Sequence, residues 1–175
     1  MLPQKTFKPL PNETSASYVK RMQENYLPDW PAEVLDSWLH YGGGLPDLFN
    51  TLDLTKLSFR KRIWLRDEIP REEVFGTNWP FKAEMQNIDN YFANPGTYWI
   101  ADYMLEHGTW NTGIIFLENQ NPEQQLRTGY GQGEVLKQPY HLLEGHNRLT
   151  ILNRLIELGK AADEHEVWIA QLTES

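Results

Sequence analysis

The chain has 175 residues, which is enough for one domain of ordinary size or one domain with an appendage. Its 40% hydrophobic and 13% aromatic content is typical of a globular protein and excludes disorder over most of the length. The net charge of −8 repels a phosphate backbone, so nucleic-acid binding would need a local basic patch and is not favoured.

Two further function classes are excluded by what the sequence lacks. Cysteine is absent, which rules out disulfides, thiolate metal sites and cysteine catalysis. No apolar run approaches the ~20 residues that cross a bilayer, and residues 1–10 do not have the pattern of a secretory signal. We therefore expect no membrane association, and a cytoplasmic location.

The N-terminal third has helical patterns. Ser15 or Ser17 is expected to cap a helix that runs to Tyr26, and a second helix is expected over residues 32–41. The second is indicated by helical spacing of its apolar residues, and Gly42, Gly43 and Gly44 break the chain after it. The sequence predicts a helical N-terminal extension over residues 1–62, with no strand of the main sheet within residues 1–60.

The middle of the chain mixes strand and helix patterns. Residues 63–69 are expected to form a strand that stops at Pro70. Helices are predicted over residues 84–92 and 97–107, the second ending at Gly108, where a left-handed stop is typical. Residues 114–117 form a short, fully apolar strand pattern.

A polar segment follows, over residues 119–138, and contains Gly129, Gly131 and Gly133. We expect a long loop there, with residues 120–138 as the most mobile internal segment and a possible lid over a site.

The C-terminal part has the clearest periodicity. A strand is predicted over residues 140–143 and another over 166–172. Between them, residues 147–158 have an apolar stripe at helical spacing and end at Gly159. The stripe consists of Leu149, Leu152, Leu155 and Ile156. Residues 63–175 are therefore expected to form an α+β core.

Three segments carry a resemblance. The first is Leu105-Glu106-His107-Gly108 followed by the strand at residues 113–117, the second is Tyr140 through Leu149, and the third is Leu158-Gly159 followed by the strand at residues 166–169. In this order they resemble the ParB/sulfiredoxin-like superfamily, whose members have a strand that enters an acid-Gly-His-x-Arg turn before a helix. Here that turn is Glu144-Gly145-His146-Asn147-Arg148. The resemblance implies a small mixed sheet of this type.

The sequence also departs from two groups of that superfamily. Sulfiredoxins have a catalytic cysteine in the turn, and this chain has none, so that chemistry is excluded. Chromosome-partitioning ParB proteins have a helix-turn-helix region after the core, whereas the last predicted strand here ends close to Ser175. We therefore do not expect the DNA-reading role of those proteins.

The chemistry of the turn allows two interpretations. Gly145 permits a sharp turn and a close approach by a ligand, and Asn147 can cap a helix whose N–H groups attract an anion. The positive charge of Arg148 in the first helical turn is unfavourable next to the helix dipole. Its presence there is explained if its planar guanidinium binds a phosphate or if it pairs with Glu144. His146 could donate to a phosphate or exchange a proton near neutral pH. The structural alternative is a tight turn with a surface ion pair and a hydrogen-bonded histidine.

The predicted site follows from the resemblance and these residues. Nucleotide binding is assigned to Gly145, His146, Asn147 and Arg148, and catalysis to His146, Glu144 and Glu68. Glu68 is one of four carboxylates, with Asp67, Glu72 and Glu73, that could supply a base or a magnesium ligand if the first strand lies beside the turn. No residue is assigned to a protein-bound metal, because the histidines lack zinc-site spacing.

Three functions remain open. The resemblance implies nucleotide-phosphate binding, with ATP or CTP and Mg²⁺ as candidate ligands and hydrolysis or phosphoryl transfer as candidate reactions. A ParB-like nuclease is allowed by a basic cluster of Arg60, Lys61, Arg62, Arg66 and Arg71, although a solvated face explains that cluster better. The third is a non-catalytic antitoxin or immunity-type protein that binds its partner through the tryptophan-rich N-terminal extension.

Overall fold

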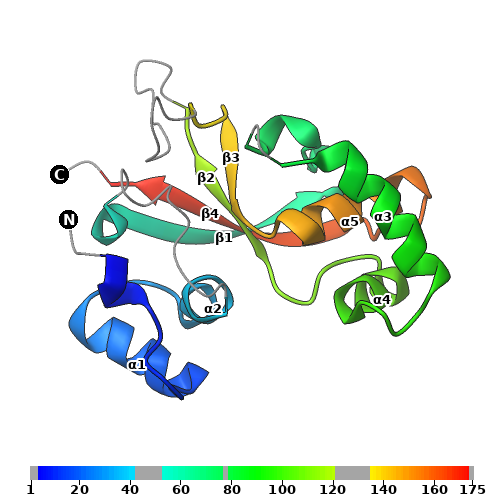
Figure 1. Ribbon diagram of the computed structural model, residues 1–175. Coiled ribbons are helices and arrows are strands. Elements are labelled where there is room, and N and C mark those ends of the chain that lie inside the picture. The colour runs from blue at the N-terminus through cyan, green and yellow to red at the C-terminus, as the bar shows by residue number, and fades with distance from the viewer. Residues whose placement is uncertain (1–3, 42–52, 77–78, 121–134, 174–175) are drawn as a thin grey trace. The chain divides into compact units, whose positions relative to one another are not determined.

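The computed structural model describes residues 4–41, 53–76, 79–120 and 135–173 (Figure 1). Within these ranges the chain is α+β, with five α-helices and a four-stranded mixed open sheet. The helices are α1 (Ser15–Asn25), α2 (Ala32–Val34), α3 (Phe81–Ala93), α4 (Trp99–His107) and α5 (His146–Glu157). The strands are β1 (Leu57–Leu65), β2 (Ile114–Glu118), β3 (Tyr140–Glu144) and β4 (Glu164–Leu172). None of the described helices is long and apolar enough to cross a membrane.

The sheet has the strand order β1-β4-β2-β3. β2 and β3 pair antiparallel, with Phe116 opposite Leu142 and Ile115 opposite Glu144. Between these two pairs the register shifts by a β-bulge. A bulge re-aims the residues beside it, and this one lies at the end of β3 that leads into the predicted turn.

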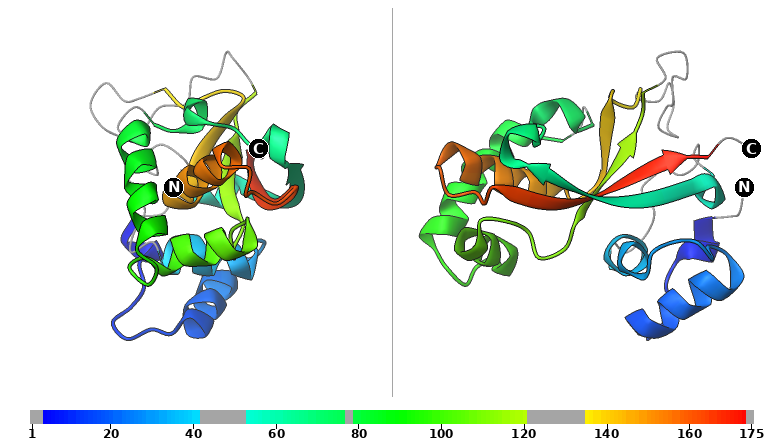
Figure 2. Two further views of the ribbon diagram at one scale, coloured as in Figure 1. Left: turned by 90° about the vertical axis from the view of Figure 1, so that its right-hand side faces the viewer. Right: turned by 180° about the vertical axis from the view of Figure 1, so that it is seen from behind.

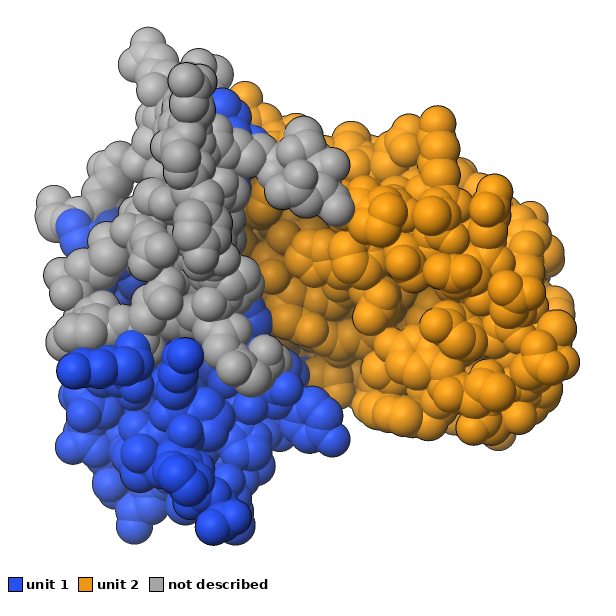
Figure 3. Space-filling model, in the orientation of Figure 1, with its two compact units in different colours: residues 1–60, 119–136, 170–175 blue, residues 61–118, 137–169 orange. Residues whose placement is uncertain are grey.

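The chain divides into two compact units, coloured separately in Figure 3. Unit 1 comprises residues 1–60, 119–136 and 170–175, and unit 2 comprises residues 61–118 and 137–169. The predicted boundary at residue 62 lies close to the division at residue 60, but unit 1 also includes two later segments that are distant in the sequence.

Unit 1 contains the two helices predicted for the N-terminal third. α1 is capped by Thr14, whose hydroxyl accepts the N–H of Ser17 at 3.3 Å, so the predicted capping by Ser15 or Ser17 is wrong by one to three residues. α2 continues into a π-helical turn over Leu35–His40. Tyr18 and Met22 of α1 and Leu35 and Leu39 of the π-helical turn are fully buried. The Trp30 and Trp38 rings stack with their centroids 5.7 Å apart.

The first strand differs from its prediction at both ends. β1 starts at Leu57, so the prediction that residues 1–60 contribute no strand is wrong. It ends at Leu65 because residues 66–68 form a 3₁₀ turn, in which a Glu68 carboxylate oxygen accepts the Leu65 N–H at 2.7 Å. The run from Arg60 to Ile63 is exposed at every position, so it lacks the alternation by which a half-buried strand is recognised.

Unit 2 buries the apolar stripe of α5 against the sheet, and α3 and α4 pack together with α5 (Figures 1 and 2). Leu149, Leu152 and Leu155 share one core with Val167 and Ile169 of β4. The predicted positions of α3, α4, α5, β2, β3 and β4 are confirmed to within a few residues.

Gly108 ends α4 as predicted, with a left-handed φ of 69°. A Cβ at this position would lie 2.7 Å from the Ala162 nitrogen, which donates a hydrogen bond to the Gly108 carbonyl. Glycine is therefore needed there both for its backbone angle and for the close approach of a second segment.

Two predicted features fall largely outside the described residues. The triple glycine at residues 42–44 is one. The other is the polar loop, of which residues 121–134 are not described, so its proposed mobility and lid role remain predictions.

Candidate functional site

The predicted turn joins β3 to α5 through Gly145. Gly145 has φ = 102° and occupies the N-cap position, so the expectation that Asn147 caps this helix is wrong. A Cβ on Gly145 would lie 2.3 Å from Cγ2 of Ile114 on β2. The space beside Gly145 is thus filled by the neighbouring strand. The structure gives this glycine a role in packing, whereas the sequence predicted that it allows a ligand to approach closely.

Arg148 and Glu144 form an ion pair across the first turn of α5. The other terminal nitrogen of Arg148 donates to the Thr112 carbonyl at 2.5 Å, and the residue is only 8% exposed. Burial raises the pKa of Glu144, while the charge of Arg148 acts in the opposite direction. The structure therefore pairs Arg148 with Glu144, one of the two partners considered for it, and anchors it to the segment that precedes β2.

His146 lies against two aromatic rings. Its ring centroid is 5.0 Å from that of Trp79 and 5.8 Å from that of Phe75. Burial lowers the pKa of His146 to about 4, so the imidazole is neutral at pH 7. It can donate a hydrogen bond, but its surroundings do not favour proton exchange near neutral pH.

Two of the four carboxylates that follow β1, those of Glu68 and Glu73, stabilise local turns. Glu68 accepts from the Leu65 N–H, and Glu73 accepts from the Arg71 N–H at 3.0 Å. No hydrogen bond or ion pair within the described ranges connects Glu68 with the Glu144–Arg148 turn. Among the described residues, no group of three or more histidine, aspartate or glutamate side chains could hold a metal ion.

Three of the five residues in the basic cluster of the sequence form separate ion pairs in unit 2. Lys61 pairs with Glu166 at 2.9 Å and Arg66 with Asp163 at 3.3 Å, while Arg71 pairs with Glu157. Because these cations already face carboxylates, their attraction for a nucleic-acid backbone is reduced.

A pocket of about 200 Å³ borders the first turn of α5. Its lining comes from α3, from the residue before α4 and from α5: Glu84, Ile88, Tyr91, Tyr98, Asn147, Thr150 and Ile151. The Tyr91 and Tyr98 ring centroids are 5.0 Å apart. Burial raises the pKa of Tyr98 more than the Asn147 side chain lowers it, so this phenol is protonated at neutral pH.

Of the predicted site residues, Asn147 lines this pocket. Glu144 and Arg148, which are close to Asn147 in the sequence, form an ion pair with each other. Sequence reasoning missed Tyr91 and Tyr98. Tyr91 follows Ile88 at helical spacing, so it was recognisable as part of the buried side of α3. Tyr98 lies just outside a helix and had no such signal.

No protein-family model matches the chain, and neither a curated protein nor a solved structure is significantly similar to it.

Proposed function

We propose that this protein binds a nucleotide, or a related phosphate compound, at the first turn of α5. ATP and CTP with Mg²⁺ are the candidate ligands. The observation that carries the proposal is the pocket beside this turn, to which Asn147 and Thr150 contribute from α5 and Tyr91 and Tyr98 from the opposite wall. The resemblance of Glu144-Gly145-His146-Asn147-Arg148 to the turn of the ParB/sulfiredoxin-like superfamily also supports it, as does the order of elements around that turn.

The phosphate is assigned to the helix N-terminus. The first N–H groups of an α-helix have no carbonyl partner within the helix, and the dipole favours negative charge there. Gly145 at the N-cap has no side chain with which to occupy these donors. The N–H groups at the start of α5 are therefore suited to phosphate oxygens.

The pocket is assigned to the uncharged part of the ligand. At about 200 Å³ it is smaller than the ~300–1,000 Å³ of drug-sized ligand sites, so it fits a base or a sugar and not a whole nucleotide. Ile88 and Ile151 offer apolar contacts, the two tyrosines offer aromatic ones, and the Asn147 amide can both donate and accept.

Arg148 supports the phosphate site indirectly in this proposal. Its guanidinium bonds Glu144 and Thr112, so it holds the strand–helix turn in shape while its charge is balanced by that of Glu144. Catalysis by Glu144, His146 and Glu68 remains a prediction. Hydrolysis or phosphoryl transfer would require Glu144 to exchange its partner Arg148 for a water or an acceptor hydroxyl.

The test uses Asn147→Asp. A carboxylate in the first turn complements the helix dipole, so the fold should be retained or slightly stabilised, while the same charge repels a phosphate. The matched control is Gln86→Glu, an equivalent amide-to-carboxylate change at an exposed α3 position about 200° around the helix from Glu84 of the pocket.

Isothermal titration with ATP, CTP, GTP and pyrophosphate, each with and without Mg²⁺, should reveal binding to the wild-type chain. We expect Asn147→Asp to weaken that binding about tenfold or more, and Gln86→Glu to leave it unchanged. Equal affinity in all three proteins would remove this turn from the site. Absence of any binding at millimolar concentration would refute the proposal.

A further inference from the structure

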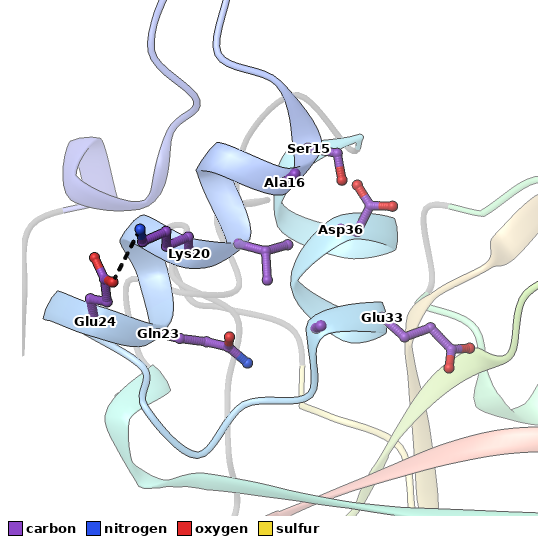
Figure 4. Close-up of a pocket in the computed structure, with 9 residues that line it drawn as sticks. Ser15, Ala16, Lys20, Gln23, Glu24, Glu33 and Asp36 are labelled. Carbon is purple, nitrogen blue, oxygen red and sulfur yellow. Dashed lines mark ion pairs between the residues drawn. The ribbon is translucent and has the colours of Figure 1, made fainter.

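The groove between α1 and α2 in unit 1 has a volume of about 610 Å³ (Figure 4). Three small apolar residues contribute to its lining, namely Ala16 and Val19 of α1 and Ala32 of α2. Other apolar side chains of the two helices, such as Tyr18, Met22 and Val34, are buried in the core of the unit instead. The groove is therefore a hollow whose apolar lining residues have short side chains.

The polar lining of the groove is acidic. Three carboxylates, those of Glu24, Glu33 and Asp36, are among its lining residues, with a single ammonium, that of Lys20. In Figure 4 Glu24 extends from the α1 side of the groove and Glu33 from the α2 side. Lys20 pairs with Glu24 at 3.8 Å, and both side chains are well exposed, at 74% and 60%. The excess of negative charge complements a basic partner.

The α2 side of the groove is not a regular α-helix. After Val34 the chain forms a π-helical turn over Leu35–His40, and π-turns within helices are often found at functional sites. Asp36 belongs both to this turn and to the groove, with its carboxylate 3.5 Å from His40 Nδ1. The irregular turn thus sets the position of one of the three carboxylates.

From this geometry and charge we propose that the groove is a docking site for a basic amphipathic helix of a partner protein. Short aliphatic side chains of the partner would enter the hollow over Ala16, Val19 and Ala32, and its arginine or lysine side chains would face the carboxylates. A groove formed by two helices is suited to a third helix, because ridges of side chains pack into the grooves between them. This inference does not depend on the proposed phosphate site, which lies in unit 2.

The probe is a fluorescent helical peptide of about 18 residues with leucine at i and i+4 spacing and arginine beside the leucines, a length that can hold a helix when bound. A matched peptide carries glutamate in place of each arginine. Fluorescence anisotropy is measured for the wild-type chain and for three variants. Glu24→Lys/Glu33→Lys reverses charge in the groove, Ala16→Phe fills the hollow, and Asp29→Lys/Glu106→Lys reverses two exposed charges elsewhere.

We expect the arginine peptide to bind the wild type at least ten times more tightly than the glutamate peptide. Charge reversal in the groove and Ala16→Phe should each weaken that binding about tenfold or more, whereas the Asp29→Lys/Glu106→Lys control should change it by less than threefold. Equal loss in the control would show attraction by the net charge alone and would overturn the proposal. It would also be overturned by no peptide binding, or by dimerisation of the wild type that Ala16→Phe abolishes, since a second copy would then be the occupant.

Discussion

Replacement of Gly145 by alanine tests whether the central glycine of the turn is required by packing. The added Cβ would lie 2.3 Å from Ile114 Cγ2 and 2.7 Å from Ile114 Cβ, and the φ of 102° is one that side-chain-bearing residues rarely adopt. The backbone contributes about 1–2 kcal/mol of destabilisation and the overlap with a buried strand residue about 1–3 kcal/mol. The expected loss is therefore about 2–5 kcal/mol, a large share of the 5–15 kcal/mol typical of a folded domain.

Gly96→Ala separates these two contributions. Gly96 has a similar φ of 88°, but a Cβ there would have no heavy atom within 4 Å, so this variant should lose only the backbone contribution of about 1–2 kcal/mol. Urea unfolding of the wild type and both variants, monitored by tryptophan fluorescence, gives the free energies of unfolding, and an unchanged m-value indicates that the same surface unfolds.

The reasoning is refuted if Gly145→Ala is no more destabilising than Gly96→Ala. In that case Ile114 would not restrict the turn, and the glycine would be explained better by the approach of a ligand. A nucleotide titration of Gly145→Ala would then decide, because loss of binding in a stable variant assigns the residue to the site.

Three further variants address the ion pair, the buried histidine and the helix cap. Arg148→Ala should destabilise the protein by about 3 kcal/mol, because it leaves the largely buried Glu144 without its cation; a loss below 1 kcal/mol in urea unfolding would contradict the burial of this pair. The pKa of His146 falls from 6.5 to about 4 on folding, so the unfolded chain binds its proton more readily and this histidine alone should lower the stability by about 3 kcal/mol as pH falls from 6.5 to 4. His146→Gln should show a shallower pH dependence over that range, and an unchanged one would be inconsistent with a buried neutral imidazole. Thr14→Ala should cost about 1 kcal/mol through loss of the bond to the Ser17 N–H, detectable as lower α1 protection in hydrogen exchange.

The sequence by itself determined most of the elements. The stripe of Leu149, Leu152 and Leu155 predicted α5, and Gly108 and Gly159 predicted where two helices end, each with a positive φ in the structure. These features are local, since helical periodicity and the conformational freedom of glycine depend on residues close together in the chain. The same holds for the strand-to-helix turn at residues 144–148, which lies where the sequence predicts it.

Only the tertiary structure decided what the residues of the turn contact. The atom that confines Gly145 belongs to Ile114, and one partner of Arg148 is the Thr112 carbonyl, each about thirty residues or more away in the sequence. The pocket likewise combines Tyr98, which precedes α4, with Asn147 of α5. Periodicity cannot reveal such pairs, because which distant segments meet is set by the packing of strands and helices and not by the local pattern. The middle of β1 shows the same limit: Leu57 and Trp64 are buried, but Arg60 to Ile63 are all exposed, so no alternation marks the strand and its start at Leu57 is defined by pairing within the sheet.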